Sequence, residues 1–298
     1  MERPFSVSEE VYPYESHWCV IDGIPVHYLD EGSGPVILLL HGNYMWSFSW
    51  RKVINQLKNE FRCIAIDLPG MGMSGKPHQL GMKDYGYTLQ EHSQVVEAVL
   101  SRLQLTNITF VAYDHGGPIG LGVAIRQPDM FSKLMITNTW AWVNRYCGTY
   151  VMSRLVPRIP GLLRSTVTSS RLLGFESPTE LEKPGVWDAC VAPYTTVDDF
   201  KPITVLANQL TQAKAYYNSL NASLAGLEDK EIVIVWATKG SGLLAKVFAE
   251  NIDEDKYFRR WQHAFPNART ELMNDVPYWF LSNPPVTFIE TLRDVAAS

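Results

Sequence analysis

The chain has 298 residues, of which 46% are hydrophobic and 19% are charged. The length suits a single α/β core with an insertion, and the composition supplies enough apolar surface for a full core, which excludes a disordered chain. With 26 basic and 31 acidic residues the formal net charge is -5, which argues against a nucleic acid as the main partner.

Membrane and metal classes are also disfavoured. No apolar run approaches the roughly 20 residues that a membrane-spanning helix needs. The N-terminal sequence MERPFSVSEE lacks the apolar segment and cleavage site of a signal peptide, so we expect a cytoplasmic protein without a membrane span. The cysteines are scattered, with no CxxC pair and no histidine at ligand spacing, which predicts reduced thiols and neither a metal site nor a cofactor. The oligomeric state stays open.

Short apolar runs rich in β-formers alternate with helical patterns along most of the chain. In chain order, the pattern predicts strands at 37–40 and 63–66, a helix at 89–103, a strand at 109–112, a helix at 117–126 and strands at 134–137 and 232–236. This alternation predicts an α/β protein with a doubly wound, mostly parallel sheet, whose ligands bind at the carboxyl ends of the strands.

The regular alternation stops between residues 143 and 212, where prolines repeatedly interrupt short helical patterns. We expect this segment to be a helical cap inserted into the core. The predicted organisation is therefore a core formed by residues 1–142 and 213–298, with a cap formed by residues 143–212.

The chemistry is expected at two turns that directly follow predicted strands. The first is LLLHGN, which ends at Asn43, and the second is AYDHGG, in which Asp114 precedes His115. The second has the small-x-nucleophile-x-small spacing of a nucleophile elbow, where small residues let a strained strand-to-helix turn close. An aspartate at this apex can attack carbon and form an ester intermediate. The alternative is that Asp114 only caps the following helix.

Several segments together resemble the haloalkane dehalogenases of the α/β-hydrolase fold. They are YLDEGSGPVILLLHGN, the pair Trp50 and Arg51, FRCIAIDLPGMGMSGKP, YTLQEH, VAYDHGGPIG and ITNTWAW. The β-lactone decarboxylases of olefin synthesis are similar over the same stretch. The resemblance implies a nucleophile at Asp114, an oxyanion or halide pocket that uses Asn43 and the backbone after the nucleophile, and a helical cap over an apolar cavity. His41 is expected to be a structural residue.

Four aromatic residues near the two turns are candidates for the lining of a substrate pocket. The alternative for each of them is ordinary core packing. They are Tyr44, Trp46, Trp140 and Trp142.

The sequence departs from the family pattern at the remaining catalytic positions. The family usually has tryptophan directly after the nucleophile, whereas this chain has His115. The two positions at which the family places its catalytic acid align with Asn138 and Gly240. The position of the family's catalytic histidine aligns with Pro277, and no histidine follows His263, which we expect on a helix remote from the pocket.

These departures favour a reaction other than hydrolysis. A carboxylate can displace a leaving group without a base, but hydrolysis of the resulting ester requires one. We therefore expect an enzyme that uses Asp114 on a small or medium hydrophobic organic molecule, in an elimination, isomerisation, decarboxylation or cyclisation. In one version Asp114 is itself the acid or base, because desolvation raises a carboxyl pKa. Two alternatives stay open: a true hydrolase or haloalkane dehalogenase whose base lies elsewhere, and a catalytically silent ligand-binding protein.

Overall fold

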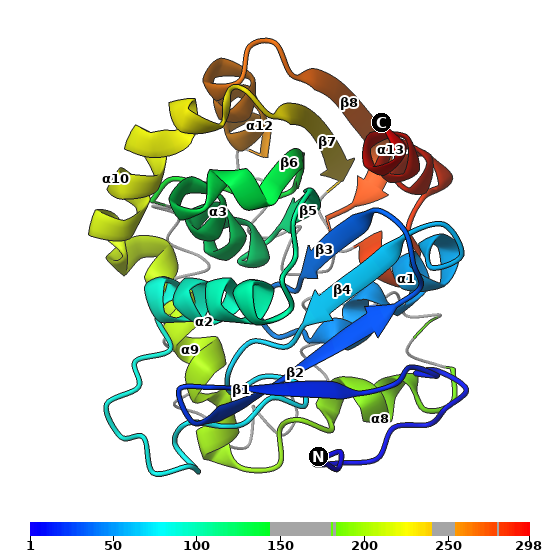
Figure 1. Ribbon diagram of the computed structural model, residues 1–298, viewed down its shortest axis with the longest axis vertical. Helices are drawn as coiled ribbons and strands as arrows, with labels where there is room; N and C mark the ends of the chain where they lie inside the picture. Colours follow the sequence, from blue (N-terminus) through cyan, green and yellow to red (C-terminus); the bar gives the residue numbers. More distant parts are fainter. Residues whose placement is uncertain (144–179, 181–182, 240–253, 279) are drawn as a thin grey trace.

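The centre of the molecule is an eight-stranded sheet with the order β1-β2-β4-β3-β5-β6-β7-β8 (Figure 1). The computed structural model describes residues 1–143, 180, 183–239, 254–278 and 280–298. Strands β3 to β8 run parallel, whereas β1 and β2 pair antiparallel at one edge and β2 is antiparallel to β4. The strands are β1 (His17–Ile21), β2 (Ile24–Glu31), β3 (Val36–Leu40), β4 (Arg62–Ile66), β5 (Ile108–Tyr113), β6 (Phe131–Thr137), β7 (Glu231–Lys239) and β8 (Arg269–Pro277).

Helices cover both faces of this sheet, and the side chains of its central strands pack into two hydrophobic cores, one on each face. In β3, Leu38 and Leu40 pack into one core and Ile37 and Leu39 pack into the other, as the alternation of side chains along a strand requires. All residues of β5 are buried. Strands that are covered on both faces consist of continuous apolar residues, and for this reason the sequence pattern predicted them. The predicted doubly wound, mostly parallel sheet is confirmed.

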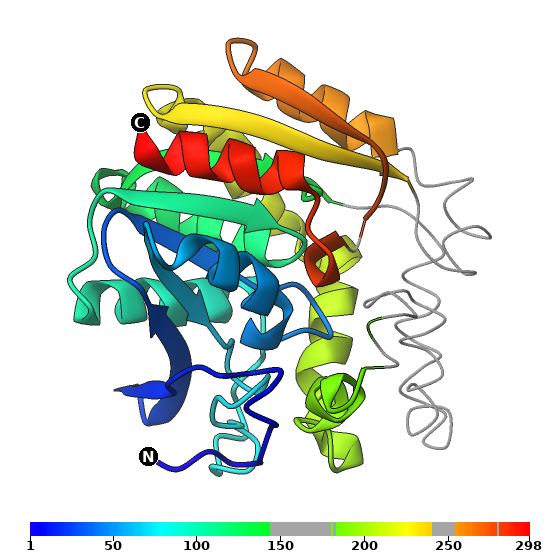
Figure 2. The same cartoon turned by 90° about the vertical axis from the view of Figure 1, so that its right-hand side faces the viewer.

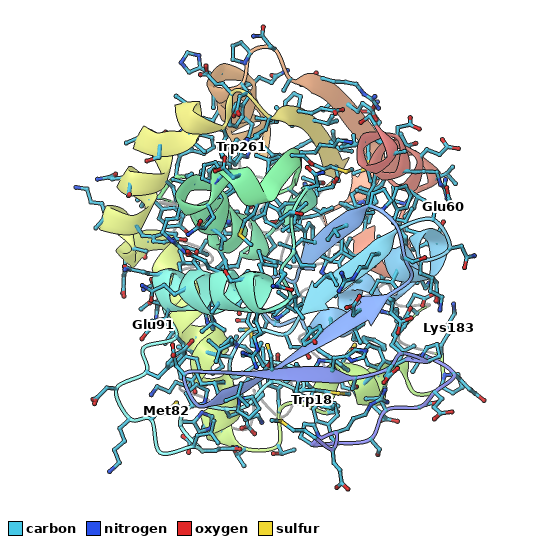
Figure 3. All side chains as sticks on the ribbon, in the orientation of Figure 1. Trp18, Glu60, Met82, Glu91, Lys183 and Trp261 are labelled. Atoms are coloured by element: carbon cyan, nitrogen blue, oxygen red, sulfur yellow. The ribbon has the colours of Figure 1, made fainter. Side chains whose placement is uncertain are left out.

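The helical layers lie on opposite sides of the sheet (Figures 1 and 2). One layer contains α2 (Leu89–Arg102), α3 (Gly116–Arg126), α10 (Lys214–Ser223) and α12 (Glu254–Ala264); the other contains α1 (Arg51–Leu57) and α13 (Val286–Ala297). Helix α2 starts at a capping box that includes Glu91, which is labelled in Figure 3. The Thr88 hydroxyl accepts from the Glu91 N–H at 3.2 Å, and the Glu91 carboxylate accepts from the Thr88 N–H at 2.9 Å. The two helices predicted from the sequence are confirmed.

Short 3-10 helices connect several of these elements. They are η1 (Ser47–Trp50), η2 (Pro128–Met130), η4 (Val197–Phe200), η5 (Leu224–Leu227) and η6 (Phe280–Ser282).

Part of the expected cap lies within the described residues. It contains α8 (Val186–Val191) and α9 (Lys201–Gln212), and backbone carbonyls of α9 accept hydrogen bonds from the turns that follow β3 and β5. Helix α9 therefore lies over the carboxyl ends of the strands. Residues 144–179, which make up about half of the expected cap, lie outside the described part, as does Gly240. Among the helices that are described, none has the length and apolar character needed to cross a membrane.

The buried carboxylate of Asp67 forms hydrogen bonds with three separate segments of the chain. Asp67, directly after β4, is fully buried and accepts hydrogen bonds from Ser47 N at 2.6 Å, Met73 N at 2.9 Å and His27 Nδ1 at 2.8 Å. Burial by itself raises the pKa of Asp67, but the charge and hydrogen bond of His27, the nearby His41 and the Met73 N–H outweigh it, so the pKa lies below its usual value. Asp67 is therefore an ionised structural group.

Candidate active site

Asp114 occupies the apex of a sharp turn between β5 and α3. Its φ of 45° is left-handed, a conformation that aspartate tolerates better than most side chains. The turn closes because Gly116 carries no side chain: a Cβ there would collide with the carbonyl of Leu40. The Thr139 hydroxyl donates to the Asp114 carbonyl at 2.7 Å and fixes the apex from β6's side. The predicted elbow therefore has its expected backbone form.

Donors from three segments surround the Asp114 carboxylate. Oδ1 accepts from the Asn43 N–H at 2.8 Å and lies 2.9 Å from His115 Nδ1. Oδ2 accepts from the Tyr278 hydroxyl at 3.1 Å. Asp114 and His115 are each 4% exposed, and Asn43 is 3% exposed. The structure thus brings the three predicted catalytic residues together, with Oδ1 more tightly held than Oδ2.

The hydrogen bonds of His115 fix where its protons lie. Nε2 is 3.0 Å from the carbonyl oxygen of Leu206 on α9, and a carbonyl can only accept, so Nε2 carries a proton. A neutral imidazole protonated there would direct the lone pair of Nδ1 at the Asp114 carboxylate. The 2.9 Å contact between Nδ1 and Oδ1 therefore requires a proton between them. Because the lowered pKa of Asp114 indicates an ionised carboxyl, we assign this proton to His115, so that the two residues form an imidazolium–carboxylate pair.

The electrostatics of Asp114 agree with this pairing. Burial alone raises the pKa of the Asp114 carboxyl. The charge and hydrogen bond of His115, together with the backbone N–H groups of His115 and Asn43, outweigh the burial and hold the pKa of Asp114 below its usual value. The carboxylate is therefore ionised at neutral pH.

Tyr278 is the site residue that the sequence analysis missed. The alignment with the family placed Pro277 at the position of the catalytic histidine, but Pro277 is exposed at the end of β8, and the next side chain reaches Asp114. The Tyr278 hydroxyl is shared, because it also donates to the Asn138 carbonyl at 2.7 Å. Tyr113 donates to the Tyr278 carbonyl at 3.2 Å and holds its backbone. Only a one-residue shift in the alignment could have revealed it.

Asn138 occupies one of the two positions at which the family places its catalytic acid, and its side-chain amide forms hydrogen bonds with the backbone of β7. Its amide donates to the Ala237 carbonyl at 3.1 Å and accepts from the Ala237 N–H at 3.0 Å, which joins the ends of β6 and β7. Gly240, the other position, lies outside the described residues.

All seven histidines of the chain lie in its described part, so each can be placed. His41 donates from Nδ1 to the Gly42 carbonyl at 2.8 Å and accepts at Nε2 from the Leu68 N–H at 3.0 Å, which fits its expected structural role. His263 is exposed on α12, as expected. Among the histidines, the one that bonds Asp114 is His115.

Asn43 and Tyr44 connect the turn after β3 to its surroundings. The Asn43 side chain donates from Nδ2 to the Ile203 carbonyl of α9 at 3.0 Å and accepts at Oδ1 from the Tyr44 N–H at 3.0 Å. Only its backbone N–H contacts the Asp114 carboxylate. Tyr44 has a left-handed φ of 63°, and burial raises the pKa of its hydroxyl to about 12.

The three candidate tryptophans occupy different surroundings. Trp140 lies edge to face with His115, with ring centroids 5.0 Å apart, and therefore belongs to the site. Trp46 packs among Phe5, Tyr12 and Phe48 and donates to the Ala189 carbonyl of α8 at 3.1 Å. Trp142 packs on Trp261, a buried residue of α12 labelled in Figure 3, with ring centroids 4.7 Å apart. The contacts of Trp46 and Trp142 are those of packing residues.

The sequence is similar to those of known proteins. Residues 35–161 match the family described as alpha/beta hydrolase fold. Haloalkane dehalogenase 2 of Mycobacterium tuberculosis (strain ATCC 25618 / H37Rv) is 29% identical over 285 residues, which cover 93% of this chain and 96% of the relative. The cis-3-alkyl-4-alkyloxetan-2-one decarboxylase of Shewanella oneidensis is 38% identical over 135 residues, 45% of this chain and 42% of the relative.

Solved structures give the same fold. The crystal structure of haloalkane dehalogenase DbeA from Bradyrhizobium elkani has a TM-score of 0.78 at 19% identity, covering 95% of this chain and 97% of that one. That of DatA from Agrobacterium tumefaciens has a TM-score of 0.74 at 23% identity, covering 95% and 96%. The chain therefore has the α/β-hydrolase fold and is similar to haloalkane dehalogenases over almost its whole length. The relatives similar in sequence are enzymes.

Proposed function

We propose that this protein is an enzyme that uses Asp114 as a nucleophile on a small or medium hydrophobic molecule and releases the product without activating water. Of the non-hydrolytic reactions considered, we propose decarboxylation of a β-lactone to an alkene. The substrate is then a strained four-membered cyclic ester, as in the decarboxylase relative's name.

One observation carries this proposal: the group facing Oδ2 of Asp114 is the Tyr278 hydroxyl, 3.1 Å away, rather than an imidazole. A phenol hydroxyl that donates to a carboxylate is a much poorer base for water than an imidazole. His115 cannot serve instead while both of its ring nitrogens donate, to Asp114 and to Leu206. An ester formed at Asp114 would therefore lack the base that hydrolysis needs.

A β-lactone substrate removes the need for that base. In the first step Oδ2 attacks the alkyl-substituted ring carbon that is bonded to the ring oxygen, not the carbonyl carbon. The bond between this carbon and the ring oxygen breaks, which frees a carboxylate on the neighbouring carbon. In the second step this carboxylate leaves as CO2, its bonding pair forms the carbon–carbon double bond, and the bond to Oδ2 breaks with its electrons returning to Asp114. The products are an alkene and CO2, and neither water nor a proton is consumed.

The test uses a cis-3,4-dialkyl-oxetan-2-one in H2¹⁸O, with CO2 and alkene measured by gas chromatography and mass spectrometry. We expect equal amounts of alkene and CO2 from the unmodified protein and neither from Asp114→Asn. We also expect no ¹⁸O in the Asp114 peptide, because water never attacks the ester. A β-hydroxy acid product, or ¹⁸O in that peptide, would show hydrolysis and contradict the proposal.

The second candidate, a haloalkane dehalogenase, is favoured by the similarity that spans 93% of this chain. A primary bromoalkane separates the two functions, since its ester carries no carboxylate that could leave as CO2. We expect one alkyl group per Asp114 in the intact-protein mass, and no adduct in Asp114→Ala. Repeated release of alcohol by the unmodified protein would instead establish the dehalogenase.

A further inference from the structure

We propose that His115 is a catalytic residue that acts in product release. Its Nδ1 proton makes the Asp114 carboxylate a leaving group, so that the covalent intermediate breaks at its alkyl carbon–oxygen bond. This inference rests on the proposed function, because it concerns the second of the two steps. It assigns to the residue after the nucleophile a role in release rather than in the initial displacement.

The two carboxylate oxygens are prepared for different parts in the reaction. Oδ1 is held by the Asn43 N–H at 2.8 Å and by His115 Nδ1 at 2.9 Å. Oδ2 is bonded to the Tyr278 hydroxyl at 3.1 Å, and that hydroxyl makes its shorter bond, 2.7 Å, to the Asn138 carbonyl. Oδ2 is therefore the more available oxygen for attack, and Oδ1 becomes the carbonyl oxygen of the ester.

The donors on Oδ1 favour one way of breaking that ester. When the alkyl carbon–oxygen bond breaks, the electron pair goes to Oδ2 and the negative charge spreads over both oxygens of Asp114. Donors already aimed at Oδ1 stabilise this charge without reorganisation. The same donors hold the pKa of Asp114 below its usual value, and a weaker base is a better leaving group. These donors make Asp114 a less reactive nucleophile in the first step, so they favour the second step, in which the product is released.

Helix α9 keeps the proton of His115 in place. The Leu206 carbonyl accepts from Nε2–H at 3.0 Å, which fixes the ring orientation so that the other N–H, at Nδ1, points at Oδ1 of Asp114. Trp140, edge to face with the imidazole at 5.0 Å, restricts the ring's orientation. The imidazolium therefore remains directed at Oδ1 when the ester forms and its counter-charge disappears. It is in place for the return of negative charge in the second step.

Two amide replacements separate the two ends of the imidazole. In His115→Asn the amide nitrogen can stand near the position of Nδ1 and donate to Oδ1. In His115→Gln it can stand near the position of Nε2 and donate to Leu206, leaving Oδ1 without this donor. Each variant is mixed with the cis-3,4-dialkyl-oxetan-2-one, quenched at short times and weighed as intact protein, while alkene is measured in parallel. Near-ultraviolet circular dichroism checks that each variant is folded.

We expect His115→Gln to become alkylated at Asp114 and to accumulate the adduct, with release slowed about 100-fold, the size of effect for one lost donor to a developing oxyanion. His115→Asn should accumulate less adduct and turn over faster than His115→Gln. Turnover of folded His115→Gln at the unmodified rate without adduct would overturn the inference while leaving the proposed function intact, as would failure of both folded variants to be alkylated. Hydrolysis by the unmodified protein would overturn the proposed function itself.

Discussion

At the scale of single residues, the proposed function depends on the hydrogen-bond partners of one carboxylate. Asp114 faces an imidazolium at Oδ1 and a phenol at Oδ2. Both groups donate hydrogen bonds to the carboxylate, and a phenol oxygen is a much weaker base toward water than a neutral imidazole. We therefore expect the identity of residue 278 to decide whether an ester at Asp114 can be hydrolysed.

Tyr278→His should convert single alkylation into slow turnover. An imidazole at this position reaches the same side of Asp114 as the phenol and can deprotonate water, a contribution of about 10² to 10⁴-fold in general-base catalysis. The measurement is alcohol release from a primary bromoalkane, with ¹⁸O from labelled water appearing in Asp114.

The matched control for this change is Pro277→His, since residue 277 is exposed and ends β8. It should show alkylation without release, as should Tyr278→Phe. Equal turnover by Pro277→His would mean that residue 277 faces the nucleophile in solution, contrary to the contact between the Tyr278 hydroxyl and Asp114.

At the scale of elements, α9 contacts both turns that contain the candidate site residues Asn43 and His115. The Ile203 carbonyl accepts from the Asn43 side chain and the Leu206 carbonyl accepts from His115, so one helix face bridges the loops after β3 and β5. Movement of α9 would therefore remove two hydrogen bonds from the site at once.

Asn43→Asp should loosen α9. The new carboxylate still accepts from the Tyr44 N–H, but it repels the Ile203 carbonyl in place of donating to it, a loss of about 1–3 kcal/mol. Hydrogen exchange of residues 201–212 should accelerate, whereas that of α13, which lies on the opposite face of the sheet, should not. Asn43→Ala, which removes the bond without adding repulsion, should have a smaller effect; equal exchange in all three proteins would contradict the bridge.

The central elements could be predicted from sequence, but the contacts within the site could not all be. Buried parallel strands such as β5 are continuous apolar runs, and the elbow requires glycine at position 116, so local composition reveals both. The edge strand β8 is largely exposed and lacks such a run. A register shift between Ala237 and Lys239 in its pairing with β7 precedes Tyr278, and pairing irregularities of this kind leave no clear sequence signal.

At the scale of the whole molecule, Asp67 contributes to stability through long-range connections. Its carboxylate bonds to segments near residues 27, 47 and 73, and the ionised form is the stronger acceptor for all three contacts. Because its pKa is lower in the folded than in the unfolded chain, its contribution is complete above the unfolded value of about 3.9 and is lost as pH falls through the folded value.

We expect Asp67→Asn to lower the free energy of unfolding at pH 7 by about 3–5 kcal/mol, the range for one removed partner of a buried pair. Its stability should also fall less steeply than that of the unmodified protein as the pH drops below about 4. Urea denaturation monitored by tryptophan fluorescence measures both.

Asp30→Asn is the comparison, because the Asp30–Arg62 pair is partly exposed and should contribute at most about 1 kcal/mol. Similar losses in the two variants would argue against a special role for the Asp67 contacts.

The packing of Trp46 has a practical consequence for anyone who handles this protein. Phe5 and Tyr12 of the N-terminal segment contact one side of this indole, while its N–H reaches Ala189 of α8. An affinity tag or a truncation that displaces Phe5 and Tyr12 would therefore remove packing partners of the tryptophan that contacts α8. Fusions are better placed after Ser298, which is exposed at the end of α13. Kinetic constants from differently tagged preparations should be compared only after the tag has been removed.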